Sequence, residues 1–325
     1  MTRHRGGLRR LLDLWGFVPG FAVASEPVRF ATRDGVSLVA DYLPGPASER
    51  DAVPALVLAH GFAGHRRKPT YAYLAERLSE VSAVLAVDLR GHGSSGGVST
   101  FGLLEALDVA AAVAWLRRRG HRWVGVIGAS MGATAALRAA AGGPPAALDA
   151  VCVISAPATW APPPSAAMRQ LTRVATVAWY RRAYGAVTRV RIAPRAWPAQ
   201  GPGEPVAPVA VVASVAPTPL LIVHGDDDHY FGPEHAQRLL AAARPPVRLW
   251  PEAAGFGHAE GWFHAGVRRP PAGCRRGCLP QRRLAARMSP GGRRAAQIGR
   301  VAYGRSDNER EDGRGSTGAD VRCAA

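Results

Sequence analysis

Gly128-Ala129-Ser130-Met131-Gly132 is the stretch that decides the fold of this chain. The apolar run 124–127 before it is typical of a buried strand, and the alanine-rich run 133–141 after it is typical of a helix. Ser130 is therefore expected on a sharp turn from strand to helix, where the pattern G-x-S-x-G presents a nucleophilic hydroxyl. Both glycines are needed because a side chain at either position would collide with the neighbouring strand or helix.

A second segment, His60-Gly61-Phe62-Ala63-Gly64, directly follows the apolar run 55–59, which is predicted to be a strand. A serine that transfers acyl groups needs amide donors for the developing oxyanion, and the loop after an earlier strand supplies one of them. We expect the backbone N–H groups of Phe62 and Met131 to form this oxyanion hole. The alternative is that His60-Gly61 merely ends a strand.

Candidates for the acid and the base of such a site occur further along the chain. The apolar run 219–224 opens into Gly225-Asp226-Asp227-Asp228, and three consecutive aspartates cannot all be buried, so at most one is expected to face an imidazole. His258, in a glycine-containing loop after the predicted strand 247–250, is the candidate base, although a lone loop histidine is usually a surface residue. The chain order Ser, Asp, His is that of one known triad architecture.

Five motifs in this order resemble the α/β-hydrolase family, close to its esterase, lysophospholipase and serine-aminopeptidase-like branch. The resemblance covers roughly residues 26–265 and implies that Asp228, three positions after Gly225, is the catalytic acid. It also implies that the turn holding His92 is structural. The motifs are His60-Gly61-Phe62, Asp88-Leu89-Arg90-Gly91-His92-Gly93-Ser94-Ser95, Gly128-Ala129-Ser130-Met131-Gly132, His224-Gly225-Asp226-Asp227-Asp228 and Gly257-His258.

The rest of the pattern predicts an α/β fold. Alternating residues in 27–32 and 36–43 flank Asp34-Gly35, a strong signal for a hairpin. Apolar runs then alternate with helical patterns, which predicts a mostly parallel sheet with helices on both faces. The expected strands are 54–59, 82–87, 123–128, 150–155 and 219–224, and the expected helices are 71–80, 103–118 and 133–141.

An insertion at residues 158–217 is longer than a simple crossover requires, and we predict a helical lid over the pocket. Met168, Leu171, Val174 and Ala178 recur at helical spacing. They form either a face packed on the main domain or an apolar wall for an acyl chain. Seven arginines make the segment basic, and residues 198–219 are expected to be the returning linker.

Charge and composition exclude some classes of function. Fourteen arginines and five acidic residues lie in 266–325, so this tail carries +9 of the net charge of +17. Lys68 is the only lysine, which is typical of codon bias in a GC-rich gene. No basic groove interleaved with aromatic residues is visible, so we expect no nucleic-acid partner.

The tail, residues 266–325, departs from the family pattern because it holds no sustained helical period where a terminal amphipathic helix is expected. We expect it to be disordered, or the product of a frameshift beyond about residue 261. Cys274 and Cys278 lack the nearby histidine or second pair that a metal site needs. Cys152 falls in a predicted core strand, and the cysteine pattern indicates a reducing compartment.

The N-terminal extension, residues 1–25, joins four arginines to an interrupted apolar run. It makes a poor signal peptide, so a cytoplasmic location is favoured over secretion. No segment is long and apolar enough for stable membrane insertion.

Taken together, these patterns predict a serine esterase that acts through an acyl-enzyme on a small or lipid-like ester, with Ser130, Asp228 and His258 as the triad and no cofactor or metal. A peptidase or amidase of the same fold and a non-catalytic binding protein are the alternatives. The oligomeric state is not predicted.

Overall fold

The computed structural model describes residues 20–46, 53–143, 147–160, 165–194, 206–250 and 256–259. The predicted extension 1–25, except its last six residues, and the tail 266–325 lie outside these ranges, as do Cys274 and Cys278.

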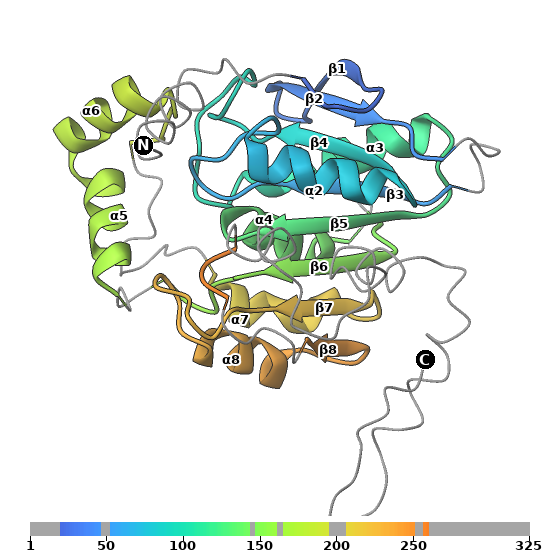
Figure 1. Ribbon diagram of the computed structural model, residues 1–325. Coiled ribbons are helices and arrows are strands. Elements are labelled where there is room, and N and C mark those ends of the chain that lie inside the picture. Colours follow the sequence, from blue (N-terminus) through green and yellow to red (C-terminus); the bar gives the residue numbers. More distant parts are fainter. Residues whose placement is uncertain are drawn as a thin grey trace, which may run out of the picture. The chain divides into compact units, whose positions relative to one another are not determined.

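Eight strands form one mixed sheet in the order β1-β2-β4-β3-β5-β6-β7-β8 (Figure 1). The predicted hairpin supplies the antiparallel strands β1 and β2, and every pairing from β4 onward is parallel. The strands are β1 (Glu26–Ala31), β2 (Ser37–Leu43), β3 (Ala55–Ala59), β4 (Ala83–Asp88), β5 (Val124–Ala129), β6 (Ala150–Ile154), β7 (Leu220–Val223) and β8 (Val247–Leu249). The α/β-hydrolase fold expected from the sequence is confirmed, and its inner strands are apolar and buried because both faces are covered.

Helices cover both faces of this sheet. α2 (Pro69–Ser79) packs Tyr71, Leu74 and Leu78 into the core on one face, together with Trp250. α3 (Glu105–Arg118), α4 (Met131–Ala141) and α8 (Glu234–Ala242) contribute to the core on the other face. Helix α4 thus begins just after the carboxyl end of β5, a strand at the centre of the sheet.

The insertion differs in detail from the sequence prediction. Residues Met168 to Ala178 do not form one helix: α5 (Ala166–Thr176) and α6 (Ala178–Thr188) are separated by Val177, whose backbone is extended. The expected linker 198–219 is also wrong in part, because 208–211 form the short helix α7 (Pro208–Val211) and 212–215 a 3₁₀ helix. Helix α8 was not predicted either, although Ala236 and Leu239, both buried, are spaced as on a helix face.

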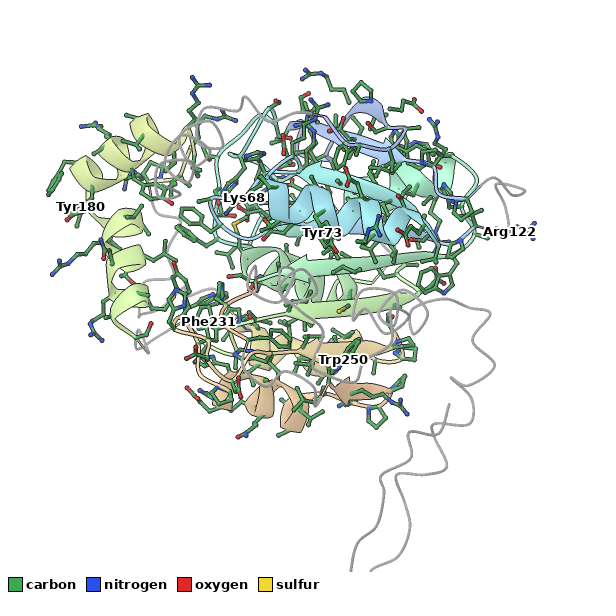
Figure 2. All side chains as sticks on the ribbon, in the orientation of Figure 1. Lys68, Tyr73, Arg122, Tyr180, Phe231 and Trp250 are labelled. Carbon is green, nitrogen blue, oxygen red and sulfur yellow. The ribbon has the colours of Figure 1, made fainter. Side chains whose placement is uncertain are left out.

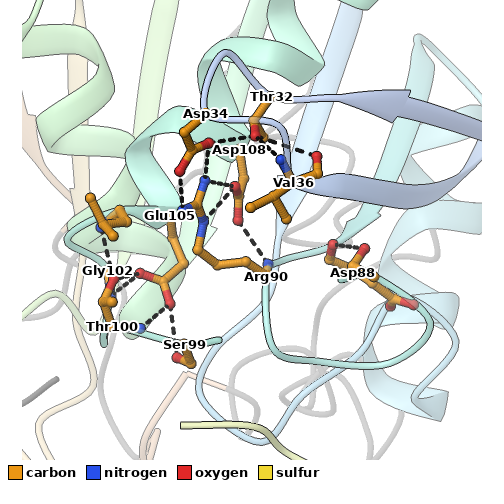
Figure 3. A network of polar contacts seen from close by, with 12 residues as sticks. Thr32, Asp34, Val36, Asp88, Arg90, Ser99, Thr100, Gly102, Glu105 and Asp108 are labelled. Carbon is orange, nitrogen blue, oxygen red and sulfur yellow. Dashed lines mark hydrogen bonds and ion pairs between the residues drawn. The ribbon is translucent and has the colours of Figure 1, made fainter. Parts of the chain in front are cut away.

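Charged side chains after β4 and at the start of α3 are joined in networks (Figure 3). Arg90, after β4, donates from Nε to Asp108 Oδ1 at 2.8 Å and from Nη1 to Asp34 Oδ2 at 2.8 Å. The carboxylate of Glu105, in the first turn of α3, accepts four hydrogen bonds from the loop before it, with donor–acceptor distances of 2.7–2.8 Å. The donors are the Ser99 hydroxyl, the Thr100 amide and hydroxyl, and the Gly102 amide.

Within the ranges that the structure describes, none of the helices combines the length and the hydrophobicity needed to cross a lipid bilayer.

Candidate active site

Ser130 occupies the turn between β5 and α4 with φ of 50° and ψ of −108°, a conformation that costs free energy for a residue with a side chain. Its amide donates to the Ile154 carbonyl at 2.8 Å, which anchors the turn to the neighbouring strand β6. A Cβ at Gly128 would lie 2.3 Å from the Gly132 carbonyl oxygen, and one at Gly132 would lie 2.3 Å from that of Ala59. Both flanking glycines are therefore required by close backbone approach, as the sequence predicts.

Asp228 and His258 are brought together from two loops that lie thirty positions apart in the sequence. Asp228 follows β7, is buried, and faces His258 Nδ1, with its two carboxylate oxygens at 2.9 and 2.8 Å. Asp226 and Asp227 are exposed, so one aspartate of the three points inward. Because the carboxylate accepts a hydrogen bond from Nδ1–H, Nε2 is left as the basic nitrogen of a neutral ring.

The Asp228 carboxylate is held in its ionised form by its hydrogen bonds. Burial by itself would raise the pKa of Asp228, but hydrogen bonds from His258 and from the amides of Phe231 and Tyr230 outweigh burial and lower it. The acid therefore remains a carboxylate throughout the range of pH in which an imidazole changes its charge, and it can orient and stabilise a protonated His258.

The described part of the loop around His258 is fixed at two points. Asp227 donates from its amide to the Phe256 carbonyl at 3.0 Å, and the Ala259 amide donates to the Ser155 hydroxyl at 2.9 Å. A Cβ at Gly225 would lie 2.1 Å from the Phe256 carbonyl oxygen, so this close approach also requires glycine. The hydroxyl of Ser155, which follows β6, is a positioning contact that sequence reasoning missed.

The loop His60–Gly64 lies beside the turn that holds Ser130, because β3 pairs with β5 and Ala59 stands opposite Gly128. The amide of Gly61 donates to the Tyr71 hydroxyl at 2.8 Å, and that of Ala63 donates to His92 Nε2 at 3.2 Å. The Phe62 amide lies between these two tethered groups. Met131 is the first residue of α4, and the N–H of a first helical residue has no acceptor within the helix.

Two buried histidines, His60 and His92, lie against this loop. Burial lowers the pKa of His60 and of His92, so both rings are neutral. His92 Nδ1 donates to the Arg90 carbonyl at 3.0 Å, which leaves Nε2 to accept from Ala63. His60 Nε2 accepts from the Leu89 amide at 3.0 Å. These contacts are consistent with the structural role expected for the turn with His92, whereas the brace from Tyr71 could not be read from the sequence.

A cavity of about 900 Å³ adjoins these groups, and Ser130, Phe62, Met131 and His258 all line it. Asp228 lies behind His258. The other walls come mainly from α5 and α6 and from aromatic residues. The larger apolar side chains among them are Phe101, Trp160, Met168, Leu171, Val174, Trp179, Val187 and Phe231. Figure 2 labels Tyr180 on α6, Lys68 before α2 and Phe231 after β7, three residues that line this cavity from separate parts of the chain.

The side chain of Phe62 links the loop to helix α6 through stacked rings. The Phe62 and Phe101 ring centroids lie 4.5 Å apart, and those of Phe62 and Tyr184 lie 5.8 Å apart with only 15° between the ring planes. Burial raises the pKa of Tyr184 to about 12, so its ring meets Phe62 as a neutral phenol. Helix α6 therefore contacts the residue whose amide is the candidate oxyanion donor.

No cluster of three or more histidine, cysteine, aspartate or glutamate side chains suited to a metal ion occurs among the described residues. Cys152 lies in β6 as predicted, and burial raises the pKa of its thiol, which makes it a poor nucleophile.

Known proteins are similar to this chain in sequence and in fold. The pattern of the "Alpha/beta hydrolase family" matches residues 56–289, well over half of the chain. In sequence, the chain is 28% identical over 236 residues to the uncharacterized protein YfhR of Escherichia coli O157:H7, and the match covers 70% of this chain and 71% of that protein.

Solved structures share the fold. An esterase of Pyrococcus furiosus, Pf2001, superposes with a TM-score of 0.56 at 24% identity, covering 74% of this chain and 85% of that one. The α/β hydrolase GrgF from a Penicillium species gives a TM-score of 0.57 at 18% identity, covering 75% and 94%. An esterase domain from Rhodothermus marinus gives 0.51 at 21% identity, covering 74% and 94%.

Proposed function

Since the chain belongs to the alpha/beta hydrolase family, we propose that it is a serine hydrolase that cleaves carboxylic esters through an acyl-enzyme. One observation carries this proposal: the Asp228–His258 pair and the strained Ser130 turn meet at one cavity, from sequence positions far apart. The esterases among the structural neighbours support the same class of reaction.

In the proposed reaction, Ser130 Oγ attacks the ester carbonyl carbon while His258 Nε2 takes the hydroxyl proton. Asp228 stabilises the imidazolium that results, and the Phe62 and Met131 amides donate to the oxyanion. Collapse of this intermediate expels the alcohol, which receives the proton from His258. Water then attacks the acyl-enzyme by the same sequence of proton transfers and releases the carboxylic acid, with no cofactor taking part.

We also propose that the α5–α6 pair acts as a lid. Trp179 and Val187 line the cavity and yet each exposes 64% of its surface, so apolar side chains stand at the border between the cavity and solvent. Ser165, the N-cap of α5, donates from its hydroxyl to the Tyr230 carbonyl at 3.1 Å and so joins the pair to the loop after Asp228. A cytoplasmic location stays a prediction from the sequence.

The first test is labelling with a fluorophosphonate, which reacts with activated serines. We expect wild type and Ser79→Ala, a control in α2, to be labelled and to hydrolyse 4-nitrophenyl esters, and Ser130→Ala to lose both properties. Loss of turnover should reach several orders of magnitude, because triads act as a unit. A folded wild-type protein that resists the label would contradict the proposal, and cleavage of matched amides in preference to esters would redirect it to an amidase.

A further inference from the structure

A buried histidine stands behind the acid of the candidate site. His224 directly follows β7, exposes 3% of its side chain, and places Nε2 2.9 Å from the carbonyl oxygen of Phe231. Because a carbonyl oxygen only accepts hydrogen bonds, Nε2 carries a proton and is the donor. The other ring nitrogen, Nδ1, is buried without a hydrogen-bond partner in the described part of the chain. The hydrogen bond that the ring makes there is therefore directed to the backbone of Phe231.

Phe231 connects this histidine to Asp228. Its carbonyl accepts from His224, and its amide donates to Asp228 Oδ1 at 3.1 Å. Its ring, labelled in Figure 2, lines the cavity, and the centroids of the Phe231 and His258 rings lie 5.9 Å apart. Phe231 thus joins His224 to the proposed acid at a position beside the proposed base.

His224 itself is placed by the sheet. Val223, the last residue of β7, accepts at its carbonyl from the Ser155 amide at 2.9 Å, so the end of the strand is fixed where His224 begins the loop. The loop between His224 and Phe231 is exposed at several positions. The hydrogen bond from His224 to Phe231 closes this loop on the rigid end of the strand.

Resting on the proposed ester hydrolysis, we propose that His224 is a positioning residue, which through Phe231 sets where the Asp228 carboxylate meets His258. His224 Nε2 lies 3.7 Å from Asp228 Oδ2, which is beyond hydrogen-bond distance, so His224 acts through the backbone of the loop. The carboxylate oxygens of Asp228 lie 2.9 and 2.8 Å from His258 Nδ1. Such a contact tolerates little displacement, since a shift of about 1 Å at a catalytic group costs roughly a hundredfold in rate.

The test removes the donor at this position. His224→Leu retains a buried apolar side chain without Nε2–H, and kcat on 4-nitrophenyl butyrate should fall by about tenfold to a hundredfold while KM stays nearly unchanged. His224→Gln keeps an N–H donor and should retain most of kcat.

His121→Leu is the matched control. The buried ring of His121 also bonds a backbone carbonyl, that of Val53 at 3.0 Å, and it does not line the cavity that Ser130 lines. Both leucine variants lose one hydrogen bond of this kind and should lose similar stability, but His121→Leu should leave kcat unchanged. An equal loss of kcat in the two variants would overturn the proposal, because the effect would then follow from stability.

A double-mutant cycle separates positioning from general support of the fold. In Asp228→Asn, where the acid is already impaired, His224→Leu should lower kcat by less than about twofold, because both residues act through the same contact. The full loss in that background would contradict the proposal. If the leucine variant does not fold, His224→Asn, whose shorter side chain withdraws the donor, is compared with His224→Gln, and equal kcat in these two would also contradict it.

If folded wild type cleaves no ester, the proposed function fails, and proton NMR then tests His224 separately. The Nδ1–H proton of His258, bonded to a carboxylate, should give a resonance at low field that disappears in Asp228→Asn. We expect this resonance to persist in His224→Gln and His121→Leu and to shift or disappear in His224→Leu. A resonance that stays in place in His224→Leu would show that His224 does not position Asp228.

Discussion

At the start of α3 the carboxylate of Glu105 accepts four hydrogen bonds, and after β4 Arg90 joins two aspartates (Figure 3). At the cavity, by contrast, Thr134 is fully buried and its hydroxyl has no hydrogen-bond partner within the described structure, and Ser130 is held in a strained conformation. Buried polar groups normally find partners because an unpaired one costs free energy. The two regions thus differ in how completely their buried polar groups are paired.

On the cavity side of this contrast, a substitution at Asp228 is expected to have the largest effect, which is on kcat. Asp228→Asn retains the size of the side chain but presents a neutral amide to His258 Nδ1, so the ring loses its orienting charge and its tautomer changes. We expect kcat on 4-nitrophenyl butyrate to fall about 10⁴-fold, as in comparable triads, while the circular dichroism spectrum stays unchanged. A variant with nearly full turnover would show that the Asp228–His258 contact has no catalytic role.

The converse change is Glu105→Gln, which should affect stability far more than chemistry. The amide places an NH₂ group where two of four donors now point, so buried donors lose their acceptor. We expect the free energy of unfolding in urea to drop by about 2–3 kcal/mol. Ser99→Ala, which removes one donor of the four, should cost less and is the matched control. Equal losses in both variants would contradict the idea that the carboxylate organises this loop.

A smaller effect is expected where the two regions meet, at the stacked rings of Phe101, Phe62 and Tyr184. Tyr184→Ala removes the ring that packs on Phe62 and should lower kcat about tenfold, because the Phe62 amide is then less well fixed toward the oxyanion. Tyr184→Phe retains the ring and should keep kcat. If both variants change only KM, Tyr184 is a part of the cavity wall and does not position Phe62.

The smallest effect concerns acid stability. The hydrogen bond from Arg90 lowers the pKa of Asp34 to about 2, from an ordinary value of 3.8. A carboxylate whose pKa is depressed on folding stabilises the protein above its ordinary pKa, and this contribution is lost as the pH falls from about 4 through 2. Asp34→Asn should therefore reduce the difference in urea stability between pH 5 and pH 2.5. The effect is modest because Asp34 is partly exposed.

The sequence predicts most of the elements that depend on a local pattern of residues. Strands β3 to β7 and the turn at Ser130 follow from apolar runs and from glycines that only close backbone approach explains. It does not predict the break at Val177, since no proline or glycine marks it. The Tyr71 hydroxyl on the Gly61 amide and the Ser155 hydroxyl on Ala259 are also missed, because each depends on which elements become neighbours in space.

The contact between Asp228 and His258 also depends on which elements become neighbours in space, since the two residues lie thirty positions apart. The motif around each of them is visible in the sequence, and their resemblance to a known family supplies the pairing. The distances that make the pair useful come from the register of β7 and β8, which no local pattern specifies.

The order of the strands has a consequence for the protein during its synthesis. The turn at Ser130 needs only strands β3 to β6, whereas its proposed acid and base follow β7 and β8, more than ninety residues later. Because chains emerge from the ribosome N-terminus first, a nascent chain carries the proposed nucleophile long before it carries the proposed base that would activate it. If the proposed mechanism holds, hydrolytic competence is acquired only after His258 has been synthesised, and polypeptides that terminate before His258 lack the base for Ser130.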